Sequence, residues 1–171
     1  MAAQSAREKE IKSETARLER LALEQEERRR TERQRQRNEE CRQRYEQRWK
    51  VLLDPQTRDH GPLTIGDIPW PLFSAHIAGR HVSDDGLPSL EEITPEAITT
   101  FLLPDVDATP PKRDDISRRN RDKFKETLLR FHPDKFEGRF MHRVPARDLE
   151  SVREAVGQVA RVLNVLMSTQ S

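Results

Sequence analysis

Hydrophobic positions are sparse over residues 1–53, and this stretch contains neither proline nor glycine. It is rich in Glu, Arg, Gln and Ala, which favour helix, so the pattern predicts one long, charged helix. A coiled-coil seam could begin with Ile11, Leu18 and Leu21, but it then meets Arg28 and is not continued. We therefore expect a monomer, or a weak dimer formed through this helix.

Four larger side chains near the end of this predicted helix share one face. Cys41, Tyr45, Trp49 and Leu52 follow one another at spacings of four, four and three residues. This spacing is typical of an amphipathic helix that packs against a core. We expect this end of the helix to dock onto the globular part of the protein.

The middle of the chain, residues 54–111, is repeatedly interrupted by proline and contains nine of the 11 prolines. Because proline pushes the residue before it towards extended geometry, the apolar run 63–73 predicts an extended segment that wraps a surface. Regular structure is expected only near residues 95–103, where Thr94 can cap a short helix and Pro95 suits its first position.

Two amphipathic helices are predicted in residues 112–171. The first runs from 116 to 131, with an apolar side and a basic side, and Pro133 prevents it from continuing. The second begins near Pro145 or Asp148. Its apolar positions step by three and four residues and form a long packing seam, Leu149, Val152, Val156, Val159, Leu163 and Leu166.

These two helices predict an antiparallel hairpin, joined by residues 132–135 and a basic loop. The fold class is therefore mainly α, with three segments: a long charged helix (1–53), a Pro-rich wrapping segment (54–111) and a helical hairpin (112–171). Trp49 and Trp70 are expected to pack against the hairpin.

The composition indicates that one compact core cannot include the whole chain, and that charge is distributed unevenly along it. Only 33% of the residues are hydrophobic and 36% are charged, although the formal net charge is just +1. The three segments carry +4, −8 and +5 in chain order. Opposite charge on neighbouring segments makes the acidic middle a candidate for neutralising the basic hairpin.

Several function classes are disfavoured by the residues present. The single Cys41 excludes an internal disulfide framework and fits a reducing compartment. No apolar run is long enough to span a membrane and none resembles a signal peptide, so we expect a nuclear or cytosolic protein without membrane contact.

Catalysis is not indicated by any motif. The sequence has no Gly-rich phosphate loop and no nucleophile elbow. No two histidines have the spacing that would place both on one helical face, so we expect no metal, no cofactor and no enzymatic activity. His76 and His81 are expected at the surface, in a turn-rich stretch. The five histidines are His60, His76, His81, His132 and His142.

One motif carries specific information. The basic helical stretch 121–131 is followed by His132-Pro133-Asp134-Lys135, and an apolar helix comes next. Pro133 fixes the backbone, and Asp134 can accept charge-assisted hydrogen bonds from a partner arginine. This arrangement resembles a J-domain, the co-chaperone module that stimulates the ATPase of 70-kilodalton heat-shock proteins, in divergent form.

The resemblance implies that the tip binds the heat-shock protein and that the basic face steers it there. By resemblance, the partner-binding residues are His132, Pro133, Asp134, Lys135, Arg119, Lys123 and Arg130. A purely structural alternative is that Asp134 caps a local turn and Pro133 only ends the helix.

A second resemblance covers roughly residues 20–168. Residues 67–71 (Asp-Ile-Pro-Trp-Pro) and 129–136 (Leu-Arg-Phe-His-Pro-Asp-Lys-Phe) are similar to segments in the C-terminal region of the NF-kappa-B inhibitor-like family. This resemblance implies a non-catalytic nuclear regulatory protein that acts through other nuclear proteins. The ankyrin repeats of that family have no counterpart in this sequence.

Nucleic acid is the main alternative partner. A cationic tract in the first predicted helix could contact RNA phosphates or act as a nuclear import signal. The corresponding function is a helical scaffold in a nuclear ribonucleoprotein. The candidate contacts are Arg28, Arg29, Arg30, Arg33, Arg35 and Arg37.

Overall fold

The computed structural model describes residues 2–57, 61–76, 89–104 and 113–169. All regular structure in these ranges is helical, and no β-strand occurs among them. The predicted mainly α fold is therefore confirmed. The chain divides into two compact units, Met1–Glu39 and Glu40–Ser171.

Helix α1 (Ala2–Leu53) supplies the first unit with its residues up to Glu39. This confirms the predicted long helix, which no proline or glycine interrupts. The described side chains of this unit are almost all exposed, including Ile11, Leu18 and Leu21. The described side chains of this unit therefore form no core of their own, and local hydrogen bonds such as that between Gln34 and Asn38 lie on its surface.

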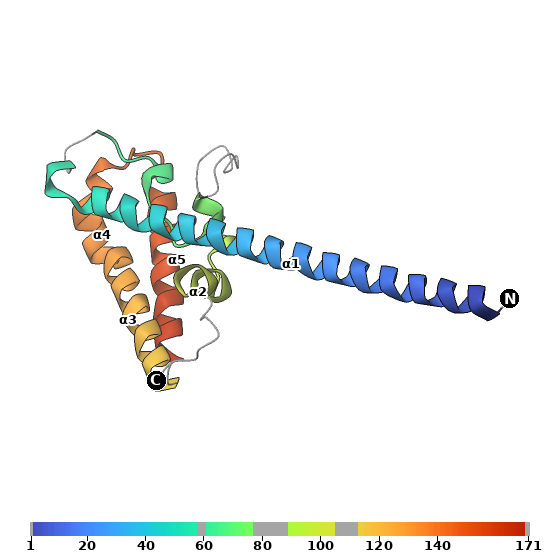
Figure 1. Cartoon of the computed structure of the whole chain (residues 1–171). Helices are drawn as coiled ribbons and strands as arrows, with labels where there is room; N and C mark the ends of the chain where they lie inside the picture. Colours follow the sequence, from blue (N-terminus) through green and yellow to red (C-terminus); the bar gives the residue numbers. More distant parts are fainter. Residues whose placement is uncertain (1, 58–60, 77–88, 105–112, 170–171) are drawn as a thin grey trace. The chain divides into compact units, whose positions relative to one another are not determined.

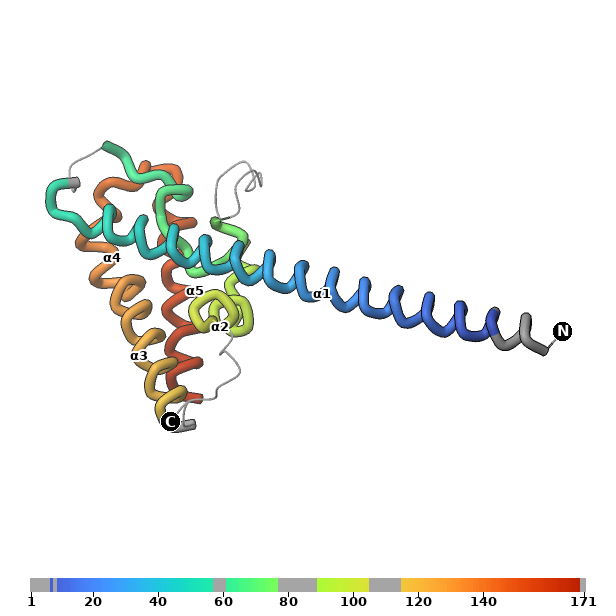
Figure 2. The backbone as a smooth tube through the Cα atoms, in the orientation of Figure 1, coloured from blue at the N-terminus to red at the C-terminus, as the bar shows by residue number. Residues whose placement is uncertain are grey.

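The second unit combines the end of α1 with four further α-helices. Helices α3 and α5 pack against each other and run in opposite directions (Figures 1 and 2), which confirms the predicted antiparallel hairpin. The α-helices are α2 (Pro95–Leu102), α3 (Arg113–Phe131), α4 (Pro133–Phe140) and α5 (Leu149–Ser168). The short 3-10 helices are η1 (Pro55–Thr57), η2 (Ile65–Asp67), η3 (Phe73–His76), η4 (Leu90–Glu92) and η5 (Met141–Arg143).

The end of α1 is part of the core of this unit, as its apolar face predicts. Cys41, Tyr45, Trp49 and Leu52 are all buried. The ring of Trp49 meets that of Phe131 edge-on, with 5.2 Å between the ring centroids. Aromatic pairs in this geometry contribute beyond the area that they bury. The hydrophobic contact of α1 with the hairpin is therefore centred on Trp49.

The wrapping segment packs its apolar side chains into the same core. Trp70 is buried and stacks on Phe131, with centroids 5.7 Å apart, and its indole N–H donates to the carbonyl of Ile65. The packing predicted for both tryptophans is confirmed. The segment is not extended throughout, because η2 and η3 interrupt it.

Arginines of α1 bind backbone carbonyls of the segments that cross them. Arg42 donates through Nε to the carbonyl of Phe101 at 2.7 Å, near the end of α2, and Arg44 donates to the carbonyl of His76 at 2.9 Å. Cations near a helix C-terminus also interact favourably with the helix dipole. These arginines therefore hold the irregular chain in place where regular hydrogen bonding is lacking.

Two details of the predicted hairpin are wrong. The connection after Phe131 is a helix, α4, followed by η5, and not a loop. Phe136 and Phe140 are both buried, and their spacing of four residues places them on one helical face. Pro133 suits the first position of this helix because its fixed φ is already helical. Helix α3 also begins earlier than predicted, at Arg113.

Helix α2 forms as predicted. The hydroxyl oxygen of Thr94 accepts a hydrogen bond from the backbone N–H of Ala97 at 3.1 Å, and Pro95 occupies the first turn. The helix buries Ile98 and Phe101 against the core. The cap and the apolar face together account for a helix of only eight residues.

Candidate partner-binding site

The residues of the predicted motif lie at the start of α4 and all four are exposed. His132 is the N-cap residue of the helix, in extended geometry, and Pro133 begins it. Asp134 lies in the first turn, where the helix dipole stabilises a carboxylate. Within the described part of the chain, the Asp134 carboxylate makes neither a hydrogen bond nor an ion pair, and the residue is exposed.

The preceding helix α3 turns part of its basic side to solvent. Arg118, Arg119 and Lys125 are exposed, as the sequence predicts. Arg119 therefore lies where a partner could reach it. Exposed cations give this face of α3 a positive potential that can attract an acidic partner.

Arg130 differs from this prediction, because it does not lie on the exposed side of α3. Its side chain is only 13% exposed, and it donates to Glu46 at 2.8 Å and to Glu126 at 2.6 Å. The guanidinium lies over the rings of Tyr45 and Trp49, at 5.6 and 5.7 Å from their centroids. Arg130 thus joins α3 to α1 inside the protein.

Glu46 of α1 also binds a second predicted steering residue. Lys123 donates to its other carboxylate oxygen at 2.7 Å, and the Lys123 side chain is 32% exposed. Burial alone would raise the pKa of Glu46, but the hydrogen bonds and charges of Arg130 and Lys123 lower that pKa below its usual value. Glu46 is therefore ionised at neutral pH and neutralises part of the basic helix.

Burial and nearby charges shift the pKa of Tyr45 and of Arg130 itself. Burial raises the pKa of Tyr45 to about 12, against the lowering effect of the Arg130 charge. Burial lowers the pKa of Arg130, but the hydrogen bond that Arg130 donates to Glu46 and its interactions with Glu46 and Tyr45 together outweigh this, so the net pKa is raised. Tyr45 stays neutral and Arg130 stays charged over the physiological range.

The cationic tract lies in the first unit, on α1. Arg28, Arg29, Arg30, Arg33, Arg35 and Arg37 are all exposed. The tract belongs to the first unit, whereas the motif residues belong to the second.

His76 is buried, so the predicted surface position is wrong; His60 and His81 lie outside the described residues. The His76 ring stacks on Phe101, and its Nε2 lies 2.8 Å from the carbonyl oxygen of Trp70. Because a carbonyl only accepts, Nε2 carries a proton. Burial lowers the pKa of His76 to about 4, so the ring is neutral at pH 7. It acts as part of the core.

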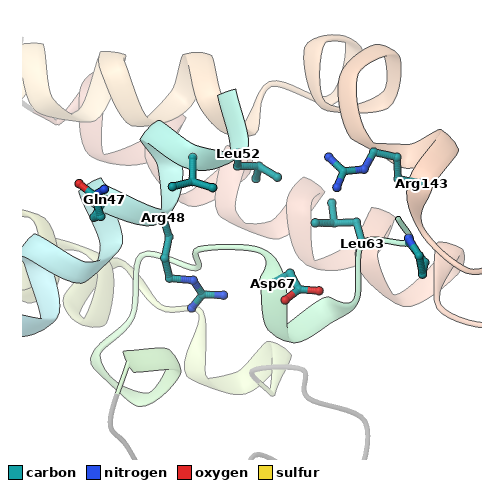
Figure 3. A pocket seen from close by; sticks show the side chains of 8 residues that line it. Gln47, Arg48, Leu52, Leu63, Asp67 and Arg143 are labelled. Atoms are coloured by element: carbon teal, nitrogen blue, oxygen red, sulfur yellow. The ribbon is translucent and has the colours of Figure 1, made fainter. Parts of the chain in front are cut away.

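A pocket of about 420 Å³ lies beside the end of α1 and was not predicted (Figure 3). Arg48 and Arg143 lie to either side of Leu52 and Leu63 in this view. Asp67 is also on its wall, and its carboxylate accepts the backbone N–H of Thr64 at 2.9 Å. The pocket is lined by Gln47, Arg48, Val51, Leu52, Pro62, Leu63, Asp67 and Arg143.

The sequence held a signal for Glu46 but not for this pocket. Glu46 directly follows Tyr45, so it lies at the edge of the apolar face of α1, where a charged side chain borders the core. The pocket combines side chains from α1, the wrapping segment and η5. Such a long-range combination leaves no periodic pattern.

Two negative findings apply to the described residues. None of the helices there is long and apolar enough to cross a membrane. No group of three or more His, Cys, Asp or Glu side chains in those residues is placed to hold a metal ion.

Comparisons with known protein families, with curated proteins and with solved structures gave no match. A functional proposal therefore rests on the geometry of the start of α4 and of the contact between α1 and α3.

Proposed function

We propose that this chain is a non-catalytic nuclear interaction protein of the NF-kappa-B inhibitor-like type, whose divergent J-like hairpin binds a 70-kilodalton heat-shock protein as a co-chaperone. The single observation that carries the proposal is the exposure of His132, Pro133, Asp134 and Lys135 at the start of α4. A carboxylate presented to solvent without an internal partner is available for a charge-assisted hydrogen bond.

The purely structural alternative has less support. If Asp134 capped a local turn, its oxygens would accept backbone hydrogen bonds, but the described residues provide none. Pro133 does more than end α3, because it also begins α4. Arg119 is exposed on the helix that leads into the motif and can speed encounter with an acidic partner.

Arg130 has a different role in this proposal from Lys123 and Arg119, although Arg130 and Lys123 share a partner. Both are engaged by Glu46, and Arg130 is nearly buried, so Arg130 orients the end of α3 that carries the motif. Lys123 is partly exposed and still contributes positive potential. Contact with the heat-shock protein is assigned to the start of α4, with Arg119 and Lys123 steering.

The test is the ATPase rate of a purified 70-kilodalton heat-shock protein at increasing concentrations of the chain. We expect saturable stimulation by the wild type and its loss in Asp134→Asn. The matched control is Glu150→Gln, which removes an exposed carboxylate from the first turn of α5 and should leave stimulation unchanged. No stimulation by the wild type, or equal stimulation by Asp134→Asn, refutes the proposal.

A second candidate function is a scaffold in a nuclear ribonucleoprotein. It is favoured by the six exposed arginines of residues 28–37 on one helix. Neutralising phosphates with such residues gives a binding constant that falls steeply with salt. Cross-linking to RNA should then map within residues 20–50, and cross-links elsewhere, or none, exclude α1 as the contact.

A further inference from the structure

Thr31 lies within the arginine tract of α1 and is exposed. It directly follows Arg28, Arg29 and Arg30, which are exposed as well. In the whole sequence, no other serine or threonine has arginine at both the second and the third position before it. Protein kinases distinguish substrates partly by the pattern of charge around the acceptor hydroxyl. Thr31 therefore combines an exposed hydroxyl residue with a charge pattern that an acidic kinase site can recognise.

The helix around Thr31 can open locally at low cost. The Thr31 hydroxyl donates to the carbonyl of Glu27 at 2.9 Å, so this bond must break before the hydroxyl can enter an active site. The described side chains of the first unit form no core, and a helix without tertiary packing is held only by weak local interactions. Local opening is easiest where few contacts are lost. The segment around Thr31 is therefore accessible to a modifying enzyme.

A phosphate on Thr31 would change the charge of the tract. Residues 28–37 contain six arginines and Glu32, which gives a net charge of +5. Phosphorylation adds a charge of about −1.5 to −2 at pH 7. Arg28 lies three residues before Thr31, so the two side chains are neighbours on one face of the helix, and the phosphate can accept charge-assisted hydrogen bonds from Arg28. The modification therefore lowers the positive charge of the tract and engages one of its arginines.

We propose that Thr31 is a phosphorylation site for a protein kinase that recognises arginine two and three residues before the acceptor hydroxyl, and that the phosphate weakens the binding of RNA to this tract. The kinase supplies ATP: Oγ1 of Thr31 forms a bond to the γ-phosphorus, the bond to the leaving ADP breaks, and the hydroxyl proton passes to the catalytic aspartate of the kinase. The regulatory part of the proposal rests on the second candidate function, RNA binding by α1.

The same helix contains an internal control, Thr15. It is also exposed, and its hydroxyl donates to the carbonyl of Ile11 at 2.8 Å, so its local geometry matches that of Thr31. The residues before it are Lys-Ser-Glu, at positions 12–14, in place of three arginines. The two threonines therefore differ mainly in the charge pattern that a kinase would recognise.

The first test is incubation of the full chain with ATP and the catalytic subunit of cAMP-dependent protein kinase, followed by mapping of the phosphate by mass spectrometry. We expect phosphate on Thr31, with incorporation at Thr15 at least about tenfold slower because its charge pattern differs. The absence of phosphate from Thr31, or an equal rate at both threonines, overturns the proposal.

Variants separate the pattern of charge from its total. Arg28→Gln combined with Arg29→Gln should slow phosphorylation of Thr31 at least about tenfold, because the recognised arginines are lost. The matched control combines Arg17→Gln and Arg20→Gln, which are exposed on the same unit and remove the same charge. Glutamine is also a good helix former, so both double variants should keep the helix. If the control slows the reaction as much, recognition of the preceding arginines is wrong.

The regulatory part is tested by the fluorescence anisotropy of labelled oligouridine, titrated with the unmodified and the phosphorylated chain at increasing salt. We expect binding at least about tenfold weaker after phosphorylation, and a salt slope smaller by about 0.7 for each RNA phosphate contact that is lost. Equal binding of the two forms overturns the regulatory role. If the unmodified chain does not bind RNA, the second candidate function and the regulatory role both fail, whereas the mapped phosphate still decides the modification site.

Discussion

Substitution of Glu46 by Gln tests how α1 is joined to the hairpin. The carboxylate accepts hydrogen bonds from Lys123 at 2.7 Å and from Arg130 at 2.8 Å, one at each oxygen. Gln keeps one acceptor oxygen but loses the charge, and its amide N–H₂ faces a cation. Arg130 then keeps only Glu126 as an ionic partner among the described residues.

The magnitude follows from the exposure of the three groups. A hydrogen bond to a charged group contributes about 1.5–3 kcal/mol, and exposed ion pairs contribute about 0–1 kcal/mol. Glu46 is 32% exposed and Arg130 is 13% exposed, so the contact lies between these limits. We expect Glu46→Gln to lower the free energy of unfolding by about 2 kcal/mol, on the scale of losing one charge-assisted bond.

The assay is urea denaturation monitored by circular dichroism. The denaturation midpoints are compared between proteins whose unfolding free energy depends on urea concentration with the same slope. The matched control is Glu40→Gln on the same helix, whose carboxylate is 64% exposed and 3.7 Å from Arg44. This control should cost less than about 0.5 kcal/mol. Equal losses for the two variants would refute the assignment of Glu46 as a structural link.

The pH dependence gives a second check on Glu46. Its pKa is lowered in the folded protein, so its contribution is present above the ordinary carboxyl pKa of about 4.3 and is lost as the pH falls through the folded pKa. The stability difference between the wild type and Glu46→Gln should therefore shrink as the solution is acidified below pH ~4. A difference that stays constant at low pH contradicts the ionised state.

Three further predictions concern the core and a cap. Burial lowers the pKa of His76 from 6.5 to about 4, so the free energy of unfolding should fall by about 3 kcal/mol as the pH is lowered from 6.5 to 4, because only the unfolded chain takes up the proton in that range. If the urea midpoint of a His76→Asn variant changes with pH in the same way as that of the wild type, this prediction is wrong. Trp70→Ala should lower the free energy of unfolding, measured by urea denaturation, by about 3–5 kcal/mol, whereas Leu129→Ala, at an exposed position, should change it by no more than about 0.5 kcal/mol. Similar losses for the two variants would place Trp70 outside the core. Thr94→Ala should cost about 1 kcal/mol by removing the hydroxyl that caps α2, and an unchanged urea midpoint would argue against that cap.

Local patterns predicted the helices well, since each leaves a periodic trace. The stepping of Val152, Val156 and Val159 identified the buried side of α5, and the absence of proline and glycine identified α1. Helix α4 was missed because Pro133 was interpreted only as the end of a helix, although proline is also favoured where a helix begins.

Long-range pairing could not be predicted in the same way. Arg130 and Glu46 are 84 residues apart, and nothing in either local pattern shows that they meet. The burial of His76 was missed for the same reason, because it depends on Tyr45 of α1 and Phe101 of α2. The exposure of Asp134, by contrast, agrees with its predicted place at the tip of the hairpin, beside Pro133.

The most direct measurement of the central claim is site-specific photo-cross-linking from the start of α4. Benzoylphenylalanine replaces Lys135, which is exposed next to Asp134, or, as a control, Glu154, which is exposed on α5. With purified 70-kilodalton heat-shock protein, we predict a cross-linked product from position 135 that Asp134→Asn abolishes, and none from position 154. No product from position 135, or equal products from both positions, would contradict the assignment of this surface as the partner contact.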